Sequence, residues 1–183
     1  MAISKRILST TVAAAAAWLA FATVVQAQDT GELRIAVSEM GHGTLDPVQG
    51  GGQNNQYLLF MFDPLIGMDL DGNAPSNQTG LATNWTISSD GMTYVFTIRE
   101  GIKFHNGEAL TAEDVKFTME RWADPTSTSE QARPLFDNLD LVTVNGTTEL
   151  EVRLKKTNPA FFQAMSPISN FGGNMIQPKD YIE

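Results

Sequence analysis

The sequence has no cysteine and only two histidines among its 183 residues. Without cysteine there is no disulfide framework, no thiolate metal site, no cysteine nucleophile and no N-terminal cysteine for a lipid anchor. Basic residues are also scarce, 12 against 21 acidic ones, which gives a net charge of −9. Because such a charge repels phosphate, the composition argues against a nucleic-acid-binding protein.

Long apolar runs are absent with one exception near the N-terminus. Val12–Ala22 contains no polar side chain, the basic residues Lys5 and Arg6 precede it, and Val25–Ala27 ends in a small residue. A basic start, a short apolar core and a compact exit are typical of a secretory signal peptide. The pattern therefore predicts a signal peptide over residues 1–27, with a cut before the next residue.

The alternative for this run is a transmembrane anchor. The run is too short to span a bilayer comfortably, and no second one follows it. Export is therefore the preferred interpretation, to the periplasm if the host has two membranes. Loss of the two basic residues would change the net charge of the chain from −9 to −11.

Alternating apolar residues predict a β-hairpin in the middle of the chain. Thr93–Arg99 places Tyr94, Phe96 and Ile98 on one face, and the Asp90-Gly91 turn joins it to an earlier strand. Further strands are expected at Leu33–Val37, Leu65–Met68, Trp85–Ile87, Leu139–Val144 and Leu150–Leu154, and helices at Gln53–Met61, Asn158–Met165 and from Lys179. Residues 124–134 are expected to form a polar loop.

The best-marked helix begins after Thr111. Thr111 is a good N-cap residue, and Asp114 at the third helical position completes a short capping box. Val115, Met119 and Trp122 fall on one stripe, which predicts the buried face. The helix is expected to end at Asp124-Pro125, because the residue before a proline is pushed out of the helical region.

The two histidines lie in loops. His42 lies in the Gly-rich Ser38–Thr44 loop, where a structural role and a ligand contact are equally plausible, while His105 is interpreted as a residue of the Phe104–Gly107 turn. No histidine pair has the spacing of a zinc motif. Ser38, His42 and Asp46 are close in sequence, but no Gly-x-Ser-x-Gly elbow supports a catalytic triad.

Several motifs resemble those of family 5 extracellular solute-binding proteins, which are the dipeptide-, oligopeptide- and nickel-binding components of ABC importers. The matching residues are Leu81-Ala82 with Trp85, Asp90-Gly91 with Tyr94, Phe96, Ile98 and Arg99, Gly101 with Lys103-Phe104-His105 and Gly107, and Thr111-Ala112 with Asp114-Val115. Leu45-Asp46-Pro47 and Asn158–Phe162 also fit the family. The only departure is Ile98, where the family has leucine.

This resemblance implies an α/β, periplasmic-binding-protein-like (type II) fold whose two lobes close on a ligand. Residues 28–183 would form only the N-terminal portion of a solute-binding domain, including a small β-rich subdomain, because family members are considerably longer. Trp85, Tyr94, Phe96 and Phe104 would belong to the core of that subdomain.

The resemblance also suggests where a ligand would bind. Family ligand contacts tend to come from the loop after the first strand, here Met40, Gly41, His42 and Gly43, and Gly41 and Gly43 would let the backbone approach a ligand closely. Weaker candidates are Tyr57, Asn170 and Phe171.

We expect no catalytic residue, no metal site and no cofactor. The expected partners are a peptide or other small-molecule ligand and the membrane permease of an ABC transporter, and no nucleic acid. Two alternatives remain open: a secreted hydrolase, and a truncated remnant that binds nothing alone.

Overall fold

The computed structural model describes residues 36, 43–49, 55–128, 132–167 and 175–182. The chain divides into two units, Met1–Ala36 and Val37–Glu183, and all described residues except Ala36 belong to the second. The predicted signal peptide and the predicted strand Leu33–Val37, apart from Ala36, lie outside the described residues.

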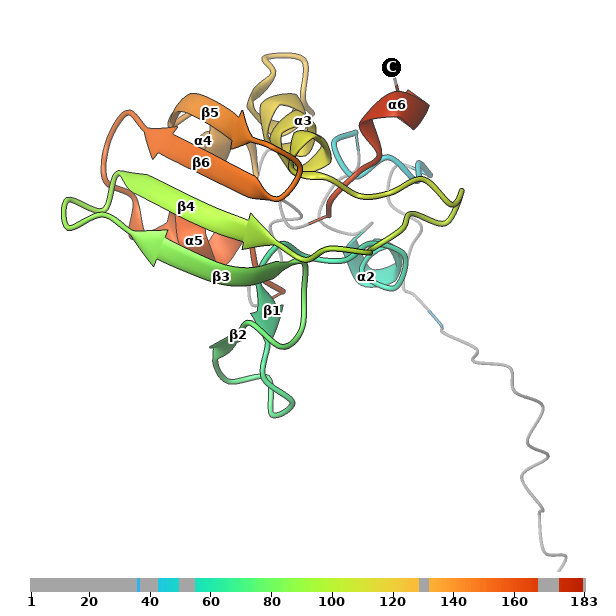
Figure 1. The fold of residues 1–183 in the computed structure, drawn as a ribbon. Coiled ribbons are helices and arrows are strands. Elements are labelled where there is room, and N and C mark those ends of the chain that lie inside the picture. Colours follow the sequence, from blue (N-terminus) through green and yellow to red (C-terminus); the bar gives the residue numbers. More distant parts are fainter. Residues whose placement is uncertain (1–35, 37–42, 50–54, 129–131, 168–174, 183) are drawn as a thin grey trace, which may run out of the picture. The chain divides into compact units, whose positions relative to one another are not determined.

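A four-stranded antiparallel sheet is the centre of the second unit (Figure 1). Its strands are β3 (Ala82–Ile87), β4 (Thr93–Ile98), β5 (Leu139–Asn145) and β6 (Glu149–Leu154), in the order β3-β4-β6-β5. The hairpin predicted around Asp90-Gly91 is confirmed, with Trp85 opposite Phe96 in its register. Strands β5 and β6 form a second hairpin, and the short turn in each hairpin fixes which side chains face the core.

Three helices cover one face of the sheet (Figure 1): α3 (Ala112–Ala123), α4 (Arg133–Phe136) and α5 (Pro159–Ala164). Phe161 on α5 contacts both Tyr94 on β4 and Phe136 on α4, with ring centroids 5.4 and 5.9 Å apart. Trp122 on α3 stacks on Phe136 at 6.1 Å. These aromatic contacts join all three helices to the sheet in one core.

The capping of α3 agrees with the prediction. Thr111 is the N-cap, the capping box with Asp114 is present, and the chain leaves the helix at Asp124 in an extended conformation. Trp122 is buried on the predicted stripe, together with Val115 and Met119.

Helix α4 corrects the expectation of a loop over residues 124–134, since it begins at Arg133. Its four residues show no helical pattern, and only Phe136 is buried. The helix forms because Phe136 packs between Trp122 and Phe161, which are contacts from distant parts of the chain.

Trp85 packs against the core as expected, although it keeps some exposure to solvent. It lies on β3, which is an edge strand of the sheet, and its ring contacts Phe162 at 5.7 Å. Phe104 is also only partly buried, whereas Tyr94 and Phe96 are core residues as expected.

Short elements surround the sheet: α2 (Asn55–Leu58), β1 (Gly67–Met68), β2 (Pro75–Ser76) and α6 (Lys179–Ile182). The predicted helix Gln53–Met61 is thus shorter, and turns continue it to Met61, while the predicted strand Leu65–Met68 has only two paired residues. Strand β2 was not expected. Within the ranges that the structure describes, no helix is both long and apolar enough to cross a membrane.

Candidate functional site

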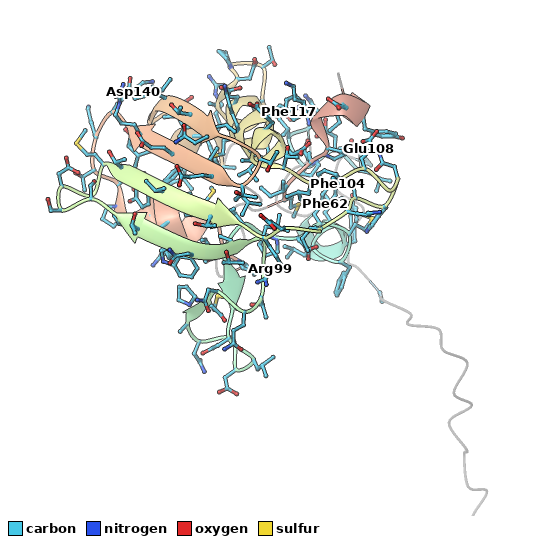
Figure 2. The ribbon with its side chains drawn as sticks, viewed as in Figure 1. Phe62, Arg99, Phe104, Glu108, Phe117 and Asp140 are labelled. Carbon is cyan, nitrogen blue, oxygen red and sulfur yellow. The ribbon has the colours of Figure 1, made fainter. Side chains whose placement is uncertain are left out.

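A cavity of about 710 Å³ lies where four segments of the second unit meet. The segments are Leu45–Pro47, Met61–Asp63, the Ile102–Asn106 loop with Leu110, and Ile176–Pro178 with the end of α6, and the single residue Leu81 before β3 adds to them. The residues that line it are Leu45, Asp46, Pro47, Met61, Phe62, Asp63, Leu81, Ile102, Lys103, Phe104, His105, Asn106, Leu110, Ile176, Gln177, Pro178, Tyr181 and Ile182. Phe62 and Phe104 are labelled in Figure 2.

The lining is mainly apolar, with a few polar groups. Lys103 and His105 come from one loop, and Asp46, Asp63 and Gln177 from other segments. Pockets that bind small molecules are typically about 300–1,000 Å³ in volume and combine an apolar lining with a small number of polar groups. The cavity therefore has the size and chemistry of a small-solute site.

The loop that carries Lys103 and His105 is held by backbone pairing. Lys103 pairs with Ala109 in an antiparallel bridge, the Phe104 N–H donates to the Glu108 carbonyl at 2.9 Å, and the Gly107 N–H donates to the Phe104 carbonyl at 2.9 Å. This is the turn predicted for His105. The sequence predicted this turn but not its place at a cavity. The order Lys103-Phe104-His105 was the signal that could have indicated a site there.

An ion pair lies at the cavity wall. Arg121 on α3 donates two hydrogen bonds to the Asp46 carboxylate, Nη1 to Oδ1 at 3.2 Å and Nη2 to Oδ2 at 2.7 Å. Nη1 also donates to the side-chain carbonyl of Gln177. Asp46 and Gln177 both line the cavity, so one guanidinium contacts two of its segments. This pairing of Asp46 also gives no support to a catalytic role for it.

The ligand-binding residues predicted from the sequence are only partly described. Met40, Gly41, His42, Asn170 and Phe171 lie outside the described residues.

Of the remaining two candidates, Gly43 has a left-handed backbone conformation with φ of 66°, and the Tyr57 hydroxyl donates to the Thr44 carbonyl at 3.3 Å. The structure thus brings Tyr57 to the end of the predicted Ser38–Thr44 loop. Neither Gly43 nor Tyr57 lines the cavity, which begins two residues later at Leu45.

Arg99, the last residue of the hairpin motif, has a structural role (Figure 2). Its Nε donates to the Gly80 carbonyl at 3.3 Å, and its Nη2 donates to the carbonyls of Asn77 at 3.0 Å and Gln78 at 3.3 Å. These bonds hold the 77–80 loop against the end of β4. Part of the motif therefore maintains the subdomain rather than contacting a ligand.

Two carboxyl groups away from the cavity have lowered pKa values. A hydrogen bond from the Ser88 hydroxyl, followed by one from the Met92 N–H, lowers the pKa of Asp90 in the hairpin turn. Hydrogen bonds from the Thr126 hydroxyl and N–H lower the pKa of Asp124 in the same way. Among the residues with described positions, no group of three or more histidine or carboxylate side chains could hold a metal ion.

Comparison with known sequences places this chain among solute-binding proteins. The model of the bacterial extracellular solute-binding proteins, family 5 (Middle), matches residues 78–180, which is more than half of the chain. The oligopeptide-binding protein OppA of Bacillus subtilis is 31% identical over 127 residues, covering 62% of this chain and 22% of OppA. The glutathione-binding protein GsiB of Escherichia coli K12 is 30% identical over 124 residues, covering 67% of this chain and 23% of GsiB.

Solved structures of type II periplasmic binding proteins share the fold. The substrate-binding domain of an oligopeptide ABC transporter from Bacillus anthracis has a TM-score of 0.66 at 21% identity, covering 80% of this chain and 30% of that one. NikZ from Campylobacter jejuni, solved with Ni(L-His), has a TM-score of 0.62 at 23% identity, covering 81% of this chain and 26% of NikZ. At these identities the likeness concerns the fold alone.

The chain spans less than a quarter of the length of the two curated relatives, 22% of OppA and 23% of GsiB. The family match covers the sheet, helices α3 to α5 and the 102–110 loop. It also contains the motifs around Trp85, Arg99 and Thr111. The chain therefore belongs to family 5 of the bacterial extracellular solute-binding proteins.

Proposed function

We propose that this chain is part of a periplasmic substrate-binding protein that captures a peptide or similar small solute and delivers it to the permease of an ABC importer. The observation that carries the proposal is the family match over residues 78–180. The family comprises substrate-binding proteins of ABC transporters. Two of its relatives bear the names oligopeptide-binding and glutathione-binding protein, so small peptides are the first solute class to test.

The cavity supports this proposal through its lining. Lys103 and His105 lie on one segment of the wall and Asp63 on another. A peptide carries one positive and one negative terminus, and groups of opposite sign in an apolar site suit such a zwitterion. The Met40–Gly43 loop, Tyr57, Asn170 and Phe171 remain candidate ligand contacts.

Export forms part of the same proposal. The N-terminal pattern of Lys5, Arg6 and the Val12–Ala22 run supports cleavage after Ala27. Mass spectrometry of protein recovered from the periplasm would then show Gln28, or its cyclised form, as the first residue. An intact Met1 on periplasmic material would refute processing at this site.

Binding is tested on the 183-residue chain by saturation-transfer NMR, which detects weak complexes. Glutathione and a tripeptide are the ligands, and an uncharged disaccharide is the control. We expect saturation-transfer signals from the two peptides and none from the disaccharide. The affinity should be weak, because this chain covers only 22–23% of its relatives. Absence of any signal would favour the alternative of a remnant that binds nothing alone.

One variant pair connects binding to the cavity. Lys103→Gln removes the cavity's lysine and should weaken binding of both peptides. Lys156→Gln removes an exposed lysine that does not line the cavity and should leave binding unchanged. The same spectra show whether the peptides stay intact, and their cleavage would favour the secreted hydrolase instead.

A further inference from the structure

Two distant segments of the chain meet at one guanidinium. Asp46 and Gln177 lie 75 and 56 residues from Arg121 in sequence, yet both accept hydrogen bonds from it. Arg121 lies in the last turn of α3, and its guanidinium carbon is 5.8 Å from the centre of the Phe117 ring. A planar guanidinium that donates from two nitrogens to one carboxylate fixes orientation as well as distance.

The backbones of both partners of Arg121 are restricted by their own local sequence. Asp46 and Gln177 each precede a proline, Pro47 and Pro178, and the residue before a proline is confined to extended conformations. The Asp46 carboxylate also accepts the Val48 N–H at 3.0 Å, which closes a local turn. Each segment therefore contacts α3 with a backbone whose conformation is already restricted.

The two segments are not tied to the fold equally. The Gln177 segment has further anchors, because the Gln177 N–H donates to the Thr118 hydroxyl at 2.9 Å and the Lys179 N–H donates to the Asp114 carboxylate at 2.9 Å. The Asp46 segment is held by its buried neighbour Val48 and by two long hydrogen bonds, from the Tyr57 hydroxyl to the Thr44 carbonyl at 3.3 Å and from the Thr128 hydroxyl to the Val48 carbonyl at 3.4 Å. The Arg121 bond of 2.7 Å to the Asp46 carboxylate is shorter than both, so the position of this segment depends more strongly on the guanidinium.

We propose that Arg121 is a positioning residue for the cavity, and that it holds the Leu45–Pro47 wall in place relative to the Ile176–Pro178 wall. Arg121 itself does not line the cavity, whereas both of its partners do. Without it, the Asp46 carboxylate would keep only its local turn. The Gln177 amide, whose nitrogen is buried with no hydrogen-bond partner, would lose its carbonyl bond as well.

Distance measurements by pulsed electron paramagnetic resonance test this proposal. The chain has no native cysteine, so introduced cysteines take nitroxide labels selectively. Reporter A joins Leu45→Cys to Thr143→Cys on the exposed face of β5, and reporter B joins Tyr181→Cys to the same Thr143→Cys. Leu45, Tyr181 and Thr143 are all exposed, and both reporters should give narrow distributions in the parent chain.

Arg121→Gln should broaden or split the distribution of reporter A and leave that of reporter B nearly unchanged. Asp46→Asn removes the same ion pair from its other side and should act alike, and it keeps the test available if Arg121→Gln does not fold. Arg121→Lys keeps the charge without the two-nitrogen geometry and should broaden reporter A less than Arg121→Gln.

The matched control is Lys116→Gln. It breaks the Lys116–Glu120 pair on the same helix, at 3.9 Å, and Lys116 does not line the cavity. Reporter A should stay narrow in this variant.

The proposal is overturned if reporter A stays narrow in both Arg121→Gln and Asp46→Asn. It is also overturned if reporters A and B broaden together, since this would indicate general loosening of the fold. All samples for the distance measurements are frozen from solutions held well below each variant's melting midpoint. The inference does not depend on which solute the protein carries, so its failure would leave the proposed function standing.

Discussion

Asp114 joins the start of α3 to the start of α6, and its replacement by alanine should destabilise the fold substantially. Its carboxylate is largely buried and accepts three hydrogen bonds. Two come from Thr111, from the backbone N–H at 2.8 Å and the hydroxyl at 2.9 Å. The third comes from the Lys179 N–H at 2.9 Å.

The loss has two contributions. Losing the capping-box bonds to Thr111 should cost about 1 kcal/mol, the typical cost of removing a helix cap. Losing a hydrogen bond to a charged group costs a further ~1.5–3 kcal/mol. We therefore expect Asp114→Ala to lower the free energy of unfolding by about 3 kcal/mol, which corresponds to a fall of roughly 6–12 °C in the melting midpoint of a domain of this size.

Urea unfolding followed by circular dichroism measures this loss. Glu113→Ala is the matched control, because Glu113 is exposed in the same helical turn and lies at the positive end of the helix dipole. That interaction is worth about 0.3–1 kcal/mol. Asp114→Asn keeps one acceptor oxygen and should fall between the two. Equal losses for Asp114→Ala and Glu113→Ala would refute the role assigned to the carboxylate.

Three further predictions follow from the described residues. Phe96→Ala should cost about 3–5 kcal/mol because its ring is fully buried, whereas Trp85→Ala on the edge strand should cost clearly less; equal losses in urea unfolding would contradict this. Gly80→Ala should lower the melting midpoint strongly, because φ is +78° and an added Cβ would lie 2.4 Å from a β1 backbone nitrogen; an unchanged midpoint in a thermal melt would show that this approach is not close. The lowered pKa of Asp90 means that its contribution to stability is present above pH 3.8 and is lost as the pH falls through the lower folded value. Breaking the hydroxyl bond with Ser88→Ala should raise the pKa of Asp90 toward 3.8 in a carboxyl NMR titration, and an unchanged pKa would refute the assigned cause.

Local sequence patterns were sufficient to predict one hairpin and the start of the longest described helix. Alternation around Asp90-Gly91 predicted the β3–β4 hairpin, and Thr111 with Asp114 predicted the start of α3. These elements depend on residues a few positions apart, so their interactions can be read directly from the sequence. The family resemblance rested on the same stretch and was confirmed by the match over residues 78–180.

Burial at the edges of the sheet required the tertiary structure. The alternation that includes Trp85 does not reveal that β3 is an edge strand, and this position leaves the ring partly exposed. Helix α4 was missed for a related reason, since its only buried residue is held by aromatic rings on α3 and α5.

The sequence by itself determined the family, the acidic character and the absence of cysteine chemistry, because each depends on composition or on one continuous stretch. The cavity depends on four segments that lie far apart in the chain. The hydrogen bonds of Arg121 join Asp46 and Gln177 at the cavity wall. No local pattern links these residues, because they lie 75 and 56 positions from Arg121 in sequence. Only the packing of α3 against both segments brings them together, and so the tertiary structure alone decided where the cavity lies.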